Sequence, residues 1–107
     1  MNGARLGQVV VIFTSERTDH DADGYAAAAQ AMEALASAQP GCCGFSSARG
    51  SDGLGITVSY WADDATARAW RDHPEHRAIR DAGRDRWYRR YEIAVAEIFR
   101  SYDWERG

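Results

Sequence analysis

Segments with strand-like and helix-like patterns alternate along this 107-residue chain in an order that restricts the fold more than any other feature. The β-branched run at residues 9–13 predicts a strand that is covered on both faces. Apolar residues then recur every three or four positions at residues 25–35, which predicts a helix that ends before Pro40. Two further strands, Cys42–Arg49 and Leu54–Trp61, are expected on either side of a turn that contains Gly, Ser and Asp.

The second half of the chain continues this alternation. Asp63 and Asp64 predict the start of a second helix, since acidic residues suit a helix N-terminus. The sequence Asp72-His73-Pro74-Glu75 has the form of a capping box and predicts that the helix restarts there, with proline in its first turn. A last strand is expected at residues 91–102.

The resulting order, β-α-β-β-α-β, predicts a ferredoxin-like α+β fold with a four-stranded antiparallel sheet. The length of the chain suits one domain. We expect this domain to span residues 8–104, after a flexible N-terminal segment at residues 1–7.

The first and last predicted strands carry apolar side chains on both faces, although two helices can cover only one face of the sheet. In the last strand, Ile93, Val95 and Phe99 alternate with Ala94, Ala96 and Ile98. Each large apolar side chain left in water forgoes about 1.5–3 kcal/mol of burial. A second copy of the chain is the simplest cover, which predicts a homodimer with sheet packed against sheet. Tyr102 and Trp104 are expected to add contacts to this dimer.

Charge and composition argue against several partners. The net charge of −3 argues against nucleic acid, because phosphate binding needs an excess of cations. No apolar run approaches the roughly 20 residues that span a bilayer, so no membrane partner is expected. Adjacent Cys42 and Cys43 suggest neither a disulfide framework nor a metal site. Without a signal-like segment at the N-terminus, we expect a cytoplasmic protein.

Residues 59–88 are rich in rings, with three of the four tryptophans and two of the three histidines. Large rings near a strand end and the following helix are typical of a small apolar pocket, but equally of an ordinary core. His76 is the best candidate for a catalytic base, because its ordinary pKa lies near neutrality. The alternative places His76 at a partly wet helix end, where it pairs with Asp72 or Glu75.

The chain resembles the antibiotic biosynthesis monooxygenase family from about Gln8 to Tyr102. That resemblance implies a dimeric α/β barrel built from two ferredoxin-like protomers. The matching features are the 9–13 strand with Ser15-Glu16-Arg17, the link Gln39-Pro40-Gly41-Cys42-Cys43-Gly44-Phe45, the pair Trp61 and Trp70, and the helix start Pro74-Glu75-His76.

The family includes cofactor-free oxygenases of polycyclic phenols and haem-degrading enzymes, and two positions bear on that choice. Trp70 lies where the haem-degrading members carry a tryptophan, but Arg80 stands where their axial histidine would be. Ser15 lies near the position of their strand-end asparagine. Because arginine cannot act as a neutral nitrogen ligand, the resemblance implies cofactor-free chemistry, with haem less favoured.

These features together predict a small cofactor-independent monooxygenase that acts on an aromatic or polycyclic hydrophobic substrate. The alternative is a non-catalytic dimeric module that binds a small hydrophobic molecule or accompanies another enzyme. The candidate catalytic residues are His76, as base, and Trp70. The candidate substrate-binding residues are Phe13, Ser15, Tyr60, Trp61, Arg80 and Trp87.

Overall fold

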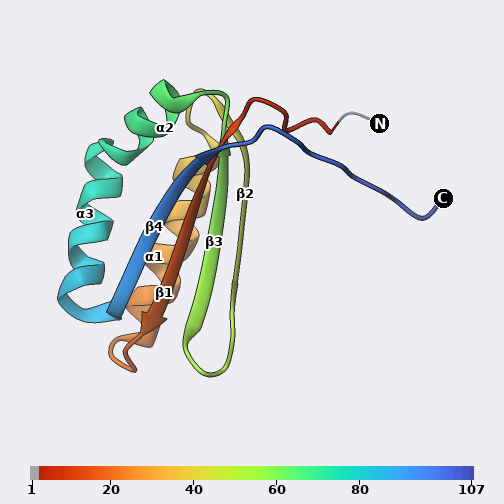
Figure 1. The fold of residues 1–107 in the computed structure, drawn as a ribbon. Helices are drawn as coiled ribbons and strands as arrows, with labels where there is room; N and C mark the ends of the chain where they lie inside the picture. Colours follow the sequence, from red (N-terminus) through yellow and green to blue (C-terminus); the bar gives the residue numbers. More distant parts are fainter. Residues whose placement is uncertain (1–2) are drawn as a thin grey trace.

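The computed structural model describes residues 3–107 and contains one four-stranded sheet with its helices on one side (Figure 1). The sheet order is β2-β3-β1-β4, and every neighbouring pair is antiparallel. The predicted ferredoxin-like α+β fold is therefore confirmed. The elements are β1 (Val9–Arg17), α1 (Ala22–Ser37), β2 (Cys42–Arg49), β3 (Leu54–Trp61), α2 (Asp64–Arg71), α3 (Pro74–Ala82), the π-helix η1 (Gly83–Trp87) and β4 (Tyr88–Glu97).

The two strands of the hairpin, β2 and β3, have the predicted bounds, but β1 and β4 differ from the prediction. β1 continues to Arg17, and β4 occupies Tyr88–Glu97 instead of residues 91–102. The reason is pairing across the sheet. β4 lies along the whole of β1, from Val9 opposite Glu97 to Arg17 opposite Tyr88, so the partner strand sets its length.

The helix starts differ from the prediction at one place. The capping box lies at the start of α2, where the Asp63 carboxylate accepts from the Thr66 backbone N–H at 2.8 Å and Thr66 Oγ1 accepts from the Asp63 N–H at 3.3 Å. The box predicted at residues 72–75 is not formed. Asp72 instead ends α2 and its carboxylate accepts from Arg71, which leaves His73 to cap α3.

The core lies between the sheet and the helices. On β3, Thr57, Ser59 and Trp61 face the helices, whereas Ile56, Val58 and Tyr60 point to the opposite side, hereafter the outer face. Strand geometry requires this alternation, because successive side chains point to opposite faces. The buried core cluster is Val9, Ala36, Trp61, Ala67 and Trp70.

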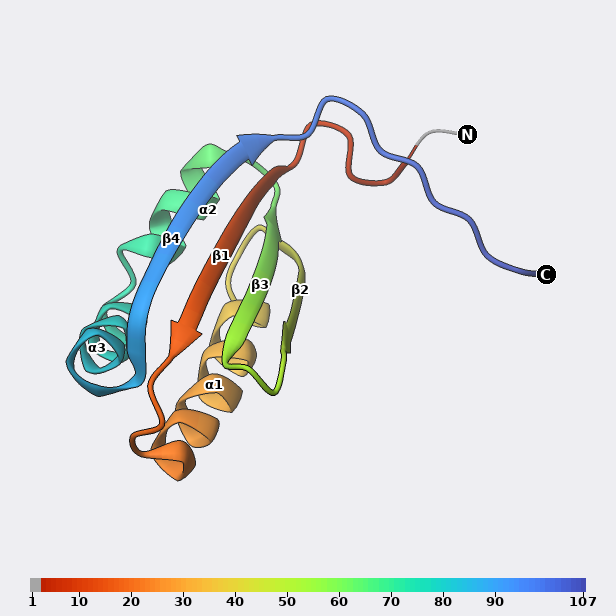
Figure 2. The same cartoon turned by 60° about the horizontal axis from the view of Figure 1, so that its bottom comes forward.

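The outer face of the sheet is apolar, and no helix within residues 3–107 covers it (Figure 2). Val10, Ile12, Val58 and Tyr60 are only half-buried, and Ile56 is 47% exposed. As the sequence predicts, the strands carry apolar side chains on both faces, and the helices cover one of them.

The two ends of the chain run side by side away from the sheet (Figures 1 and 2). Gly7 donates to the Ile98 carbonyl and Gly3 donates to the Ser101 carbonyl, both at 2.8 Å. Residues 3–7, predicted to be flexible, therefore form a turn paired with the opposite end; residues 1 and 2 lie outside the described part. Beyond β4, three large rings are exposed: Phe99, Tyr102 and Trp104.

Between residues 3 and 107, we find no helix with both the length and the apolar character needed to cross a membrane.

Candidate active site

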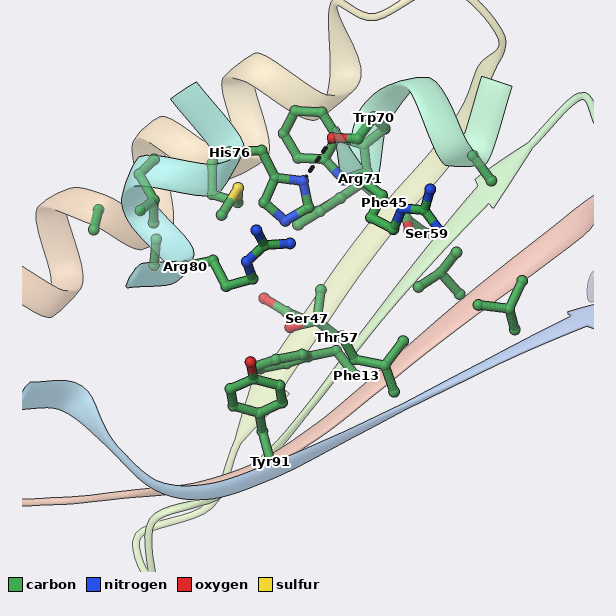
Figure 3. A pocket seen from close by; sticks show the side chains of 18 of the residues that line it. Phe13, Phe45, Ser47, Thr57, Ser59, Trp70, Arg71, His76, Arg80 and Tyr91 are labelled. Atoms are coloured by element: carbon green, nitrogen blue, oxygen red, sulfur yellow. Dashed lines mark hydrogen bonds between the residues drawn. The ribbon is translucent and has the colours of Figure 1, made fainter. Parts of the chain in front are cut away.

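A cavity of about 410 Å³ lies between the helices and the sheet (Figure 3). Its volume falls within the range of small-molecule sites. All four strands and the helices contribute to its wall, which is mostly apolar and aromatic. The apolar wall includes Phe13, Met32, Phe45, Trp70, Ile79, Trp87 and Ile93.

The cavity opens to solvent along β4. Ile93 and Val95 line the cavity, yet they are 50% and 56% exposed. Both lie on the helix-facing side of the sheet, opposite Phe13 and Val11 of β1. A ligand can therefore enter beside this strand without displacing the buried core.

A stack of three rings leads from the core to the cavity. Trp61 is fully buried and its indole N–H donates to Ser59 Oγ at 2.9 Å. Trp70 stacks on Trp61 with ring centroids 5.9 Å apart and planes at 21°. His76 stacks on Trp70, with centroids 4.2 Å apart and planes at 24°. Because Trp61 and Trp70 are held by the core, they fix the plane of the His76 ring.

His76 is also held by a hydrogen bond that determines which of its nitrogens is free. Its Nδ1 lies 2.8 Å from the backbone carbonyl oxygen of Trp70 (Figure 3). A carbonyl oxygen can only accept, so Nδ1 carries a hydrogen. In the neutral ring, Nε2 is then the nitrogen with the free lone pair. Figure 3 shows it on the side of the ring toward Arg80 and the cavity.

The surroundings of His76 favour its neutral form. Burial lowers the pKa of the imidazole below its ordinary value of 6.5, and the charges of Arg80 and His73 lower it further, against the opposing effect of the hydrogen bond to Trp70. At neutral pH the ring is therefore neutral, with its one hydrogen on Nδ1 and none on Nε2, which is the state a general base requires.

Three arginines from α2 and α3 line the cavity, and they differ in how their charge is compensated. Arg68 lies 2.7 Å from the Asp64 carboxylate, and Arg71 lies 3.0 Å from the Asp72 carboxylate. Arg80 is more buried than either, with 25% of its side chain exposed, and it points into the cavity (Figure 3).

The part of the cavity wall formed by β2, β3 and β4 carries hydroxyl groups. Ser47 and Thr57 contribute aliphatic hydroxyls, and the phenol oxygen of Tyr91 accepts from Arg84 Nε at 2.6 Å. Burial and the neighbouring Tyr25 raise the pKa of Tyr88 to about 12, so this phenol keeps its proton at neutral pH. The hydroxyls can orient a ligand by hydrogen bonds without adding charge.

The structure brings five of the eight predicted site residues into the cavity wall. They are Phe13, Trp70, His76, Arg80 and Trp87. His76 does lie in the first turn of α3, but it binds and stacks on Trp70 instead of pairing with Asp72 or Glu75. His73 takes the capping position instead, where its Nδ1 accepts from the Glu75 N–H at 3.2 Å.

The other three predicted residues lie outside the cavity wall, and this corrects the expected site. Tyr60 lies on the outer face, because it alternates with the helix-facing residues of β3. There the guanidinium carbon of Arg5 lies 3.6 Å from the centre of the Tyr60 ring. Ser15 is buried and its hydroxyl accepts from Arg49 at 2.8 Å. Trp61 lies behind Trp70 in the core.

Sequence reasoning did not identify Phe45, Ser47 and Thr57 as cavity residues. A signal for them exists, because Phe45 and Ser47 alternate along β2 opposite Ser59 and Thr57 of β3. Recognising it requires the register between the two strands, which the hairpin turn sets.

Comparison with known proteins gives a match over most of the chain. The family model for antibiotic biosynthesis monooxygenase matches residues 8–82. Among curated proteins, the uncharacterized protein YqjZ of Bacillus subtilis is 44% identical over 90 residues, which cover 84% of this chain and 78% of that protein.

Several solved structures share the architecture. SnoaB from Streptomyces nogalater, a cofactor-independent oxygenase, has a TM-score of 0.76 at 15% identity and covers 89% of this chain and 96% of its own. A Deinococcus radiodurans protein that bears the family name has a TM-score of 0.81 at 12% identity, with 91% and 98% covered. PA3566 from Pseudomonas aeruginosa has a TM-score of 0.74 at 16% identity, with 90% and 98% covered. At these identities the likeness shows the fold alone.

Proposed function

Since the chain belongs to the antibiotic biosynthesis monooxygenase family, we propose that it is a small cofactor-independent monooxygenase acting on an aromatic or polycyclic hydrophobic substrate. One observation carries the proposal. A neutral histidine, His76, presents a free ring nitrogen to a cavity whose walls are mostly apolar and aromatic. The cofactor-independent chemistry named for SnoaB, which has the same fold, supports this choice.

Such a reaction requires three things of a protein. The substrate must lie flat against a wall, lose a proton, and meet dioxygen out of bulk water. Phe13 and Phe45 bring aromatic rings to the cavity wall, where a planar substrate can pack. The ring of Trp70 is packed against Trp61 and His76 and supports the base. His76 Nε2 can accept the proton, and the ring stack keeps this nitrogen at one position.

The oxidation of a phenol to a quinone balances with dioxygen as the only oxidant. His76 takes the phenol proton, and the electron-rich anion passes an electron to dioxygen. Recombination forms a carbon–oxygen bond, and the resulting peroxide takes the proton back from His76. Loss of the ring proton then breaks the O–O bond. One oxygen atom becomes the new carbonyl and the other leaves as water, so the substrate gives up four electrons and dioxygen accepts four.

Replacement of His76 tests this function. Wild-type protein is expected to consume dioxygen when it is given 1,5-dihydroxynaphthalene, and to form the quinone juglone. No flavin, haem or metal is added. In His76→Gln, turnover should fall about 10²–10⁴-fold, the usual contribution of a general base, with substrate binding retained. Oxygen uptake and quinone absorbance measure turnover, and quenching of tryptophan fluorescence measures binding.

His20→Gln serves as the matched control, because His20 lies outside the cavity wall and its side chain is 76% exposed. It should oxidise the naphthalene at the wild-type rate. Unchanged turnover in His76→Gln would disprove the role of His76. Tight binding by a wild-type protein that consumes no oxygen would instead favour the alternative, a non-catalytic module that binds a small hydrophobic molecule.

We also propose that the protein acts as a homodimer, with the outer faces of two sheets packed together. The support is the open apolar face formed by Val10, Ile12, Ile56 and Val58, which one chain leaves in water. Closed two-fold dimers are the commonest oligomers of soluble proteins. The exposed rings of Phe99, Tyr102 and Trp104 extend beyond β4 and would lie close to a partner placed there.

A further inference from the structure

Arg80 is distinguished from the other cavity arginines by its buried and uncompensated donor. Its Nε is buried and has no hydrogen-bond partner within residues 3–107. The nearest carboxylate oxygen, on Asp81, lies 4.0 Å from this nitrogen, which is beyond hydrogen-bond distance. Arg68 and Arg71, in contrast, have carboxylates at 2.7 and 3.0 Å.

A buried N–H donor without an acceptor is unfavourable, even on a side chain that is partly exposed. Arginine stays charged at every ordinary pH, so it cannot relieve the cost by losing a proton. A buried donor that lacks a partner weakens the fold, because nothing replaces the water it lost. An arginine placed in this way is well suited to a ligand that brings the missing acceptor.

The surroundings of Arg80 indicate which acceptor fits. Its guanidinium points into the cavity near His76, whose pKa it lowers. Within residues 3–107, the one carboxylate of the cavity wall, on Asp64, is already paired with Arg68. The phenol of Tyr91 accepts from Arg84. An oxygen atom beside Arg80 would therefore meet a cation, a neutral imidazole and apolar walls.

We infer that the cavity binds its aromatic ligand through an ionised oxygen, a phenolate or an enolate, held by the guanidinium of Arg80. This inference rests on the proposed function for the reaction that follows binding, and it assigns to Arg80 the selection of ligands that carry an ionisable oxygen. The O–H bond of the ligand breaks, His76 Nε2 receives the proton, and the negative charge stays on the oxygen against Arg80. No oxidant takes part in this step.

The test uses the naphthol that carries a nitro group para to its hydroxyl, whose phenolate absorbs visible light and resists oxidation. In wild-type protein, the pKa of the bound naphthol should lie below its value in water, because Arg80 stabilises the anion. In Arg80→Gln, affinity for the anion should fall about tenfold to a hundredfold, the usual contribution of a hydrogen bond to a charged group. Arg80→Lys should recover part of this loss.

Two controls distinguish the effect of the Arg80 charge from a change in the shape of the cavity. Arg71→Gln removes a cavity arginine that is already paired with Asp72, and it should bind the anion as wild type does. Nitronaphthalene, which has no ionisable oxygen, should bind wild type and Arg80→Gln alike, which also reports that the cavity of the variant is intact. If Arg80→Gln does not fold, the pKa of the naphthol bound to wild-type protein tests the inference by itself, since a value below that in water supports the anion site.

The inference is overturned if wild type leaves the pKa of the naphthol unchanged or raises it, or if Arg80→Gln binds the anion as tightly as wild type. These results differ from failure of the proposed function. If affinity for the anion depends on Arg80 but no phenol is oxidised, the anion site is supported and the proposed monooxygenase function is contradicted. If Arg80→Gln oxidises phenols as fast as wild type, the proposed monooxygenase function is supported and the anion site at Arg80 is contradicted.

Discussion

At the scale of single residues, the informative feature is the way in which neighbours define the chemical state of His76. Trp70 contributes twice, since its ring stacks on the imidazole at 4.2 Å and its carbonyl binds Nδ1 at 2.8 Å. Burial lowers the pKa of His76 and nearby Arg80 lowers it further. One ring nitrogen is thereby occupied and the other is available as a base at neutral pH.

The pH dependence of turnover follows from this lowered pKa. The base works only when neutral, so kcat/KM should be constant near pH 7 and should fall in acid, with a midpoint below 6.5, the ordinary pKa of histidine. Removing the nearby cation in Arg80→Gln should move the midpoint upward, toward 6.5. Rates of oxygen uptake between pH 4 and 8 measure this, and a midpoint above 6.5 in wild type would contradict it.

At the scale of elements, the break between α2 and α3 positions the site. Asp72 ends α2, and Pro74 begins α3 in a new direction after the cap at His73. The break places Trp70, at the end of one helix, under His76, in the first turn of the next. The π-helix η1 then turns the chain into β4, held by the Trp87 indole N–H, which donates to Asp21 at 3.1 Å.

The capping box of α2 provides a stability prediction. Asp63→Ala removes the acceptor for the Thr66 N–H and should lower the free energy of unfolding by about 0.5–2 kcal/mol. Asp64→Ala is the matched control, since the Asp64 carboxylate makes an exposed ion pair with Arg68 one turn later but no capping hydrogen bond within residues 3–107. Its loss should cost about 0.3–0.5 kcal/mol. Urea denaturation followed by circular dichroism measures both, and equal losses would contradict the assignment of the cap.

At the scale of the whole molecule, the sheet has two apolar faces and helices for only one. The helix-facing side holds the core and the cavity, whereas the outer face and the rings beyond β4 stay exposed. Leu54 and Ile56 are 40% and 47% exposed on β3, although this strand is paired with a neighbour on both sides. A partner on this face would leave the cavity on the opposite side of each protomer.

A charge placed on the outer face tests the dimer. Wild-type protein at micromolar concentration should sediment as twice the 11.9 kDa chain. Val58→Lys should sediment as a monomer, because a buried unpaired charge at the interface is costly. Gln30→Lys adds the same charge to an exposed position of α1 and should remain dimeric. A wild-type protein that sediments as a single chain would disprove the dimer.

Most of the fold could be predicted from the sequence, because strand and helix patterns are local. The alternation in β3 correctly separated Thr57, Ser59 and Trp61 from Ile56, Val58 and Tyr60. The end of β4 could not be predicted in this way. Alternating apolar residues continue past Glu97, so only the pairing with β1 shows where the strand stops.

The sequence by itself determined the order of elements, the faces of the strands and the residue types available for chemistry, since each depends on neighbours along the chain. Tertiary structure alone decided that Trp61 supports the site from behind while Trp70 lines it. It also decided that His76 binds the Trp70 carbonyl. Among the residues that the structure describes, it left Arg80 Nε without a hydrogen-bond partner, whereas Arg68 and Arg71 have close carboxylates. These properties depend on distances between segments far apart in the sequence, which packing of the helices on the sheet sets.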